Sequence, residues 1–420
     1  MSDVLNKEIG VYIPSFFFIK IFKQFDEYNF SSILLSQDYF HEFIHFLQDT
    51  STTFGMMNFI SSISCIQSDA FIAQAANPAI KLPISTQVGT ASYNDIRISF
   101  INGDNHLVYN PMFIKTDMAD HWAINTQTVR IIYNGSNEYY FGVKAIHETM
   151  AYLSEQILFK NKKSLADFPY LAAMYIADDV CPGFSHNIRN LIALCDASLM
   201  CCNPPEVFYI TLLYINQNKI TPVSYQEVYD IVTSLFHYPC DLTLLDLYIT
   251  NAIKSLSSLK CYLGSDQIFI NEYSFVDSVI WNMMHIRCNR TSFILDILEA
   301  DFNLTSYIEI LKQINLPITY NIDDEGFVDN RYPETNNTDF GLYRTMYELY
   351  VFFHHGVSDN TLPVRYECGL LKHCQSSSNK TYVDCRCCNA PWQRAQDKVL
   401  CPFAKIWHRW GLTNKKLEYL

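Results

Sequence analysis

The sequence has no run of eighteen or more apolar residues, the length that marks a candidate membrane-spanning helix. We expect no secretory signal, because the apolar stretch at 11–21 is short and contains Pro14 and Lys20. No basic region precedes that stretch, and no small-residue cleavage site follows it. We therefore expect a cytoplasmic protein with no membrane partner.

Charged residues are scarce, at 17% of 420 residues, and positive charge is the scarcer sign, with a net charge of −13. This excludes a protein whose whole surface is built for nucleic acid, since phosphate contacts need Lys and Arg. The shortage of basic residues does not extend to the segment that begins at Arg365. From there to the C-terminus ten basic residues outnumber four acidic ones, a local charge of +6 against −19 for the rest of the chain. The asymmetry predicts a separate module, and nucleic-acid binding is expected only through this tail.

Apolar residues make up 49% of the sequence, enough for a large core, and the length favours more than one domain. We predict an α+β fold in three parts. The first part, 1–165, mixes helices with a small sheet. The second, 166–360, shows helical periodicity and is predicted to be mainly α-helical. The third, 361–420, is the basic tail, which is rich in Cys and Trp.

The pattern of apolar residues and turn residues places the individual elements. Asn134-Gly135 between two β-rich runs is typical of a hairpin turn. Strands are predicted at 96–101, 107–109, 128–133 and 139–143. Helices are predicted at 32–49, 56–67, 144–159, 186–202, 205–216, 225–236, 242–259, 275–300, 307–314 and 341–355.

The most informative motif is His41-Glu42-Phe43-Ile44-His45, within a predicted helix that has an apolar body and no Pro or Gly. A spacing of four places both imidazoles on one helix face, where both can reach one Zn²⁺ at about 2.0–2.1 Å. Glu42 then projects beside the metal and can take a proton from the metal-bound water. We predict His41 and His45 as zinc ligands and Glu42 as a general base.

A catalytic zinc site needs a third protein ligand, and the predicted helix at 144–159 is the best source. On it Glu148, Ala151, Tyr152 and Glu155 share one face. The small Ala151, one turn after Glu148, allows close approach to the first helix. Glu148 is the preferred third ligand, with His147, which points about 100° away, as the alternative.

These residues resemble the gluzincin branch of the zincin metallopeptidases, in which a His-Glu-x-x-His helix is followed by a helical Glu ligand. The resemblance implies a zincin-like catalytic domain, a zinc ion held by His41, His45 and Glu148, and Glu42 as the base in peptide hydrolysis. It also implies acidic residues that orient the histidines, for which Asp49 and Glu155 are the candidates.

The sequence departs from that family in three respects. The gap of 103 positions between His45 and Glu148 is far longer than in typical gluzincins, and His147 stands where the family has Asn. The transition-state-stabilising residue has no clear equivalent; Tyr152, His237, His354 and His355 are candidates. A metzincin is excluded, because no His-x-x-Gly-x-x-His continues the motif.

Six of the fourteen cysteines lie in the basic tail: Cys368, Cys374, Cys385, Cys387, Cys388 and Cys401. Such a cluster can form a structural zinc site, although Cys-x-Cys-Cys is not the paired spacing of a zinc ribbon. The alternatives are reduced or redox-sensitive thiols. The tail tryptophans suit either base stacking in single-stranded nucleic acid or packing onto the helical part.

We therefore expect a zinc-dependent hydrolase, an intracellular metallopeptidase that uses Zn²⁺ to cleave a restricted polypeptide substrate. Two alternatives remain open at this stage. The first is a non-catalytic protein- or nucleic-acid-binding module that uses the tail. The second is hydrolysis of a non-peptide amide or ester, which requires the same chemistry.

Overall fold

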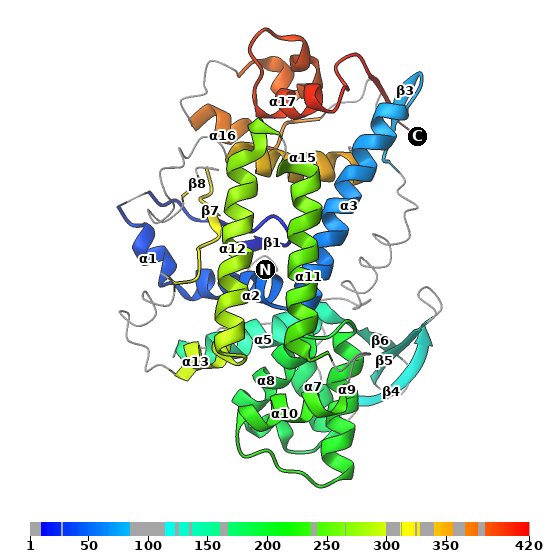
Figure 1. Ribbon diagram of the computed structural model, residues 1–420, viewed down its shortest axis with the longest axis vertical. Coiled ribbons are helices and arrows are strands. Elements are labelled where there is room, and N and C mark those ends of the chain that lie inside the picture. The colour runs from blue at the N-terminus through cyan, green and yellow to red at the C-terminus, as the bar shows by residue number, and fades with distance from the viewer. Residues whose placement is uncertain are drawn as a thin grey trace, which may run out of the picture.

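The structure is a computed structural model in which helices predominate and short strands form three sheets (Figure 1). It describes residues 10–26, 28–84, 114–121, 126–133, 137–159, 167–236, 242–264, 266–299, 311, 313–323, 326–327, 340–355, 366–376 and 383–419. The helices are α1 Phe30–Leu34, α2 Gln37–Ser51, α3 Thr53–Ala75, α5 Val143–Leu158, α6 Asp167–Tyr170, α7 Ala172–Val180, α8 Ile188–Leu199, α9 Pro204–Gln217, α10 Tyr225–Leu235, α11 Leu244–Leu259, α12 Ile270–Asn289, α13 Phe293–Glu299, α15 Phe340–His355, α16 Leu371–Ser376 and α17 Pro402–Arg409. The strands are β1 Gly10–Ile13, β2 Phe18–Ile21, β3 Ala79–Leu82, β4 Ile114–His121, β5 Thr126–Tyr133, β6 Asn137–Phe141, β7 Ile318–Tyr320, β8 Gly326–Phe327 and β9 Lys416–Tyr419.

Side-chain caps mark the start of helix α2, which carries the His-Glu-x-x-His motif, and the start of the next helix, α3. The Ser36 side chain accepts a hydrogen bond from the Tyr39 N–H at the N-terminus of α2. Thr52 follows α2 and accepts from the Gly55 N–H, so it caps the start of α3. Such caps satisfy backbone N–H groups that a helix leaves unpaired. The helix predicted at 32–49 is therefore two helices, α1 and α2, separated at the Ser36 cap.

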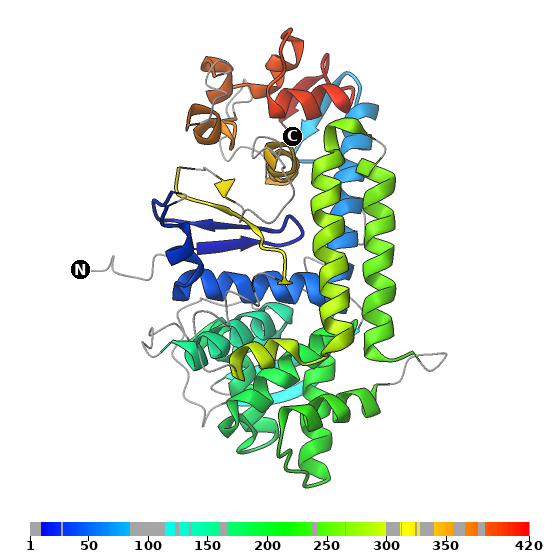
Figure 2. The same cartoon turned by 60° about the vertical axis from the view of Figure 1, so that its left-hand side comes forward.

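A four-stranded sheet in the order β1-β2-β7-β8 covers one side of α2. β1 and β2 form an antiparallel hairpin, and β7 joins β2 in parallel from far along the chain, with Phe18 opposite Ile318. Figure 2 shows α2 lying between this hairpin and α5. The helix with the motif is thus enclosed by a sheet on one side and a helix on the other, which fixes the directions of its side chains.

Elements from the three predicted parts of the chain share these sheets. β7 lies in the range 166–360 but pairs with β2 of the first part. β3 pairs in parallel with β9 at the end of the tail. Beside this pair, the Lys415 Nζ donates to the backbone oxygens of Gln74 and Ala76, both at 2.6 Å. The predicted parts are therefore joined by backbone pairing.

Helices α11 and α12 run side by side along the length of the molecule, with α3 next to α11 (Figures 1 and 2). They also hold the C-terminal end of α2. The Tyr248 hydroxyl of α11 donates to the Thr50 backbone oxygen at 2.9 Å. Arg287 of α12, which is fully buried, donates to the Ser51 backbone oxygen at 3.0 Å and pairs with Asp196 of α8.

The tail packs onto α15 through aromatic side chains. Trp407 is fully buried and Trp410 nearly so, and both rings stack near Phe353 at centroid distances of 6.0 and 6.3 Å. The Trp392 ring stacks on Phe352 at 5.7 Å. These contacts agree with the packing alternative for the tail tryptophans.

The α+β class is confirmed in its general form, as a mainly helical chain with small sheets. The hairpin around Asn134-Gly135 is confirmed by the antiparallel pairing of β5 with β6. The single helix predicted at 275–300 is two helices, α12 and α13, because the chain turns at Arg290. The segments predicted at 96–101 and 107–109 lie outside the described residues, as does most of 307–314.

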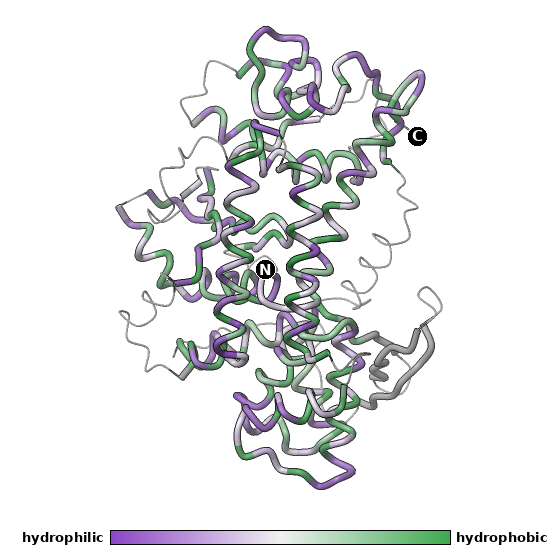
Figure 3. Tube along the Cα trace, in the orientation of Figure 1, coloured by the Kyte–Doolittle hydropathy of each residue, from purple (hydrophilic) through white to green (hydrophobic). Residues whose placement is uncertain are grey.

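Polar residues recur along the helices, so green apolar segments in Figure 3 stay short. In the described ranges no helix combines the length and the apolar character that crossing a bilayer demands.

Candidate metal centre

His41 and His45 point from the same face of α2 toward one position. Their Nε2 atoms are 3.3 Å apart, and the ring centroids lie 4.9 Å apart in an edge-to-face arrangement. Both imidazoles are largely buried. The predicted i, i+4 geometry is thus present, and each ring presents Nε2 to the shared position.

Glu148 of α5 completes the group. Its Oε2 lies 3.3 Å from the His41 Nε2 and 3.4 Å from the His45 Nε2. The two helices pack against each other, and the small Ala151 of α5 is fully buried. The three ligand atoms all lie within 4.8 Å of one another, and no other such group occurs in the described residues.

His147, the alternative ligand, does not join this group. Its ring centroid is 6.3 Å from that of His45, and it packs at 6.0 Å from Phe54. Its Nε2 is buried with no hydrogen-bond partner among the described residues. Burial, with a smaller contribution from the neighbouring His45, lowers the pKa of His147 to about 3, so this imidazole is neutral. The geometry therefore favours Glu148 over His147.

Each candidate histidine is held at its second nitrogen. The His41 Nδ1 lies 3.1 Å from the Glu155 Oε2, and the His45 Nδ1 lies 2.8 Å from the Gln48 Oε1. The Gln48 Nε2 in turn donates to the His147 backbone oxygen at 3.0 Å. An Nδ1–H that donates to these oxygens leaves the Nε2 lone pair directed at the shared position, as metal binding requires.

Glu155 therefore contacts a candidate ligand, as expected, whereas Asp49 makes its hydrogen bonds to the β1–β2 hairpin. The Asp49 Oδ2 accepts hydrogen bonds from the Tyr12 hydroxyl and the Ser15 N–H, both at 2.7 Å. Asp49 thus anchors the β1–β2 hairpin to α2. The residue that contacts the His45 Nδ1 is Gln48, which the sequence did not single out.

Glu42 is held against strand β1. Its Oε2 accepts a hydrogen bond from the Tyr12 N–H at 2.8 Å. The strand can come this close because residue 10 is glycine: a Cβ there would lie 3.1 Å from the Glu42 Cγ and 2.9 Å from the Ile21 Cδ1. Burial raises the pKa of Glu42 above its usual value, opposed by the two histidines and the Tyr12 N–H. A buried carboxyl with a raised pKa is suited to general-base work near neutral pH.

The charges of the candidate ligands are coupled. Burial alone would raise the pKa of Glu148, but His45 and His41 outweigh it and hold that pKa well below its usual value. Burial alone would lower the pKa of His41, but the hydrogen bonds with Glu148 and Glu155 raise it to about 10. A positive charge is therefore strongly stabilised at the point that the three ligand atoms face.

One tyrosine lies next to the group, and a second packs against the first. The Tyr170 ring of α6 is 6.0 Å from the His41 ring, and the Tyr152 ring is 6.1 Å from that of Tyr170. Tyr152 was a sequence candidate for stabilising a transition state, one turn after Glu148. Tyr170 was not, because it reaches the site from a four-residue helix with no motif of its own.

The other candidates for that role are elsewhere or undescribed. The His354 Nε2 pairs with the Asp69 Oδ2 of α3 at 2.8 Å, which ties α15 to α3. His237 and the side chain of His355 lie outside the described residues.

The chain was compared with protein families, curated proteins and solved structures. No family model, curated protein or solved structure matches it. The assignment of a role to this site therefore depends on its geometry and chemistry.

Proposed function

We propose that the protein is a zinc-dependent hydrolase in which His41, His45 and Glu148 hold the metal and Glu42 is the general base. The observation that carries the proposal is the separation of the three ligand atoms, 3.3–3.4 Å in each pair. Ligands at about 2.0–2.1 Å from a tetrahedral zinc ion are about 3.3–3.4 Å apart. Two imidazoles and one carboxylate are the ligand set of many catalytic zinc sites, which keep the fourth position for water.

Different residues of the chain have different roles in the proposed hydrolysis. Zinc supplies a Lewis acid that lowers the pKa of its bound water to about 7 and polarises the substrate carbonyl. Glu42 takes the proton from the attacking water at Oε1, since Oε2 is engaged by the Tyr12 N–H, and then delivers it to the leaving group. Glu155 and Gln48 keep the two imidazoles in the ligating tautomer.

An extended polypeptide is the substrate class that strand β1 favours. Among the described strands β1 pairs only with β2, so no described strand pairs with its other edge. The Tyr12 N–H on that edge points to Glu42. An extended peptide can add to a strand edge through main-chain hydrogen bonds, and this edge would guide it past Glu42. Hydrolysis of small esters without hydrolysis of peptides would contradict this part of the proposal.

The metal content of the purified chain tests the site. We expect His41→Ala and Glu148→Ala each to lose one equivalent of zinc relative to the wild type, measured by elemental analysis. His147→Gln is the matched control, because it changes the neighbour of Glu148 on the same helix and should keep that equivalent. Zinc that persists in both ligand variants would show that it is bound elsewhere, and the hydrolase proposal would be abandoned.

Replacing Glu155 with alanine is expected to weaken zinc binding by about 10–100-fold without removing a ligand, because the His41 ring loses the partner that orients it. A competition titration with a chromophoric chelator measures the change. Lys144→Ala, at an exposed position of the same helix, is the control and should bind zinc as the wild type does. Equal affinities for Glu155→Ala and Lys144→Ala would show that Glu155 does not support the ligand.

A further inference from the structure

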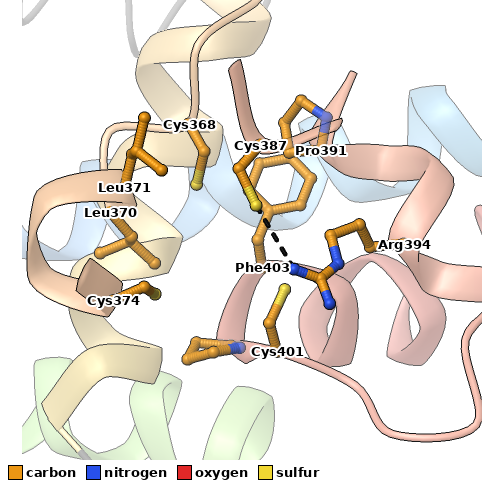
Figure 4. Close-up of a pocket in the computed structure, with 10 residues that line it drawn as sticks. Cys368, Leu370, Leu371, Cys374, Cys387, Pro391, Arg394, Cys401 and Phe403 are labelled. Carbon is orange, nitrogen blue, oxygen red and sulfur yellow. Dashed lines mark hydrogen bonds between the residues drawn. The ribbon is translucent and has the colours of Figure 1, made fainter. Parts of the chain in front are cut away.

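Four of the six tail cysteines line one pocket. Cys368, Cys374, Cys387 and Cys401 are buried at its wall. Figure 4 shows the four side chains around the same space. The other two tail cysteines, Cys385 and Cys388, are exposed, although they lie in the same short 3₁₀ helix as Cys387. Burial thus distinguishes these four cysteines from the two exposed ones, although their positions in the sequence show no regular spacing.

Backbone pairing brings these segments together. The Cys368 N–H donates to the Cys387 backbone oxygen at 2.8 Å, and the Tyr366 N–H donates to the Asn389 oxygen at 2.9 Å. Cys374 lies in α16, and Cys401 is the residue that precedes α17. The two backbone hydrogen bonds therefore hold the segments of Cys368 and Cys387 side by side at the pocket.

Hydrogen-bond donors are directed at three of the four sulfurs. The Leu370 N–H interacts with the Cys368 sulfur, and the Phe403 and Ala404 N–H groups interact with that of Cys401. The Arg394 Nη1 donates to the Cys387 Sγ at 3.4 Å, and this guanidinium is almost fully buried. Burial raises the pKa of the Cys368, Cys374 and Cys401 thiols, and the backbone donors at Cys368 and Cys401 oppose that rise. Donors of this kind stabilise a thiolate once a cation has displaced the proton.

We propose that Cys368, Cys374, Cys387 and Cys401 form a second, structural zinc site. Four thiolates are the ligand set of closed structural zinc sites, and soft thiolate ligands select zinc over hard cations such as Mg²⁺ and Ca²⁺. In the described residues only the first site already has its ligand atoms within 4.8 Å of one another. Zinc binding therefore requires the four sulfurs to move closer together. Zinc displaces the four thiol protons, and Arg394 offsets part of the resulting negative charge.

The role of this site is to stabilise the tail. The elements around the four cysteines are short, with six residues in α16, four in the 3₁₀ helix Cys385–Cys388 and eight in α17, which Cys401 precedes. Elements of this size have little core of their own, and a metal that joins the four cysteines supplies the missing cross-link. The Trp407 and Trp410 contacts with α15 then hold the cross-linked tail on the helices.

Zinc content of the full chain, purified under reducing conditions, tests the second site separately from the first. We expect two equivalents in the wild type, one in His41→Ala, one in Cys387→Ser and none in the double variant. Cys388→Ser is the matched control, because it removes an exposed thiol of the same 3₁₀ helix, and it should keep both equivalents. Two equivalents in folded Cys387→Ser would overturn the proposal.

A second measurement does not depend on the folding of a cysteine variant. His41→Ala protein reconstituted with Cd²⁺ should show the ultraviolet thiolate-to-cadmium charge-transfer band, and four thiols should become reactive to a thiol reagent when a chelator removes the metal. Absence of the band, or disulfides among the four cysteines in freshly purified reduced protein, would overturn the proposal. The first site has no thiolate ligand, so its failure would leave this band unchanged.

Discussion

Replacing Glu42 with glutamine is expected to lower kcat for peptide hydrolysis by about 10²–10⁴-fold while the protein keeps the zinc of the first site. Glutamine retains an oxygen that can accept the Tyr12 N–H, so the contact between α2 and β1 survives. What is lost is the carboxylate that accepts the proton of the attacking water. KM should change little, because Glu42 acts on the water and not on the bound peptide.

The measurement is steady-state hydrolysis of a peptide cleaved by the wild type, with zinc content determined on the same samples. Asp38→Asn is the matched control, since Asp38 lies in the first turn of the same helix and interacts with Lys23 at 3.3 Å. It should retain the wild-type kcat. If Glu42→Gln retained it as well, a different group would be the base, and the roles proposed for this site would be wrong.

The clustering of His41, His45 and Glu148 could be predicted from the sequence because the relevant geometry is largely local. The i, i+4 spacing places His41 and His45 on one helix face without knowledge of any other element. The choice of Glu148 needed only one further assumption, that its helix approaches through Ala151, and the burial of Ala151 agrees with it.

Of the residues that contact the second ring nitrogens of the two histidines, Glu155 was predicted and Gln48 was not. Asp49 and Gln48 are adjacent on α2, about one turn after His45, and their contacts with other elements distinguish them. The Asp49 carboxylate is engaged by Tyr12 and Ser15, residues more than thirty positions away, whereas Gln48 joins His45 to the His147 backbone oxygen. Tyr170 is a similar case, because its contact with His41 depends on how α6 packs on α5.

The strand pairing that joins the three predicted parts of the chain could not be predicted from the sequence either. β7 has three residues, too few to show the alternation by which a strand is identified in a sequence. Its pairing with β2 nevertheless places a segment near residue 318 in the sheet that covers α2. Composition and periodicity indicate where elements change in kind, whereas the pairing of distant short strands depends on the tertiary fold.

One long-range contact links the stability of the fold to the site. Arg287 and Asp196 are both fully buried and form a bidentate pair at 2.7 and 2.8 Å. The same guanidinium donates to the backbone oxygen and the side chain of Ser51, the last residue of α2, at 3.0 and 3.1 Å. The end of a helix leaves carbonyl oxygens unpaired, and Arg287 satisfies one of them. It therefore fixes the end of the helix that carries His41 and His45.

Replacing Arg287 with methionine is expected to lower the free energy of unfolding by about 3–5 kcal/mol, because Asp196 becomes a buried charge without its partner. Urea unfolding followed by circular dichroism measures the change. Arg290→Met is the control, since that side chain is 70% exposed and lies 3.8 Å from Asp296, and it should cost at most about 1 kcal/mol. The double variant Arg287→Met with Asp196→Leu should recover part of the loss, because it removes the unpaired charge. A small effect of Arg287→Met alone would show that water reaches Asp196 and that the end of α2 does not depend on this pair.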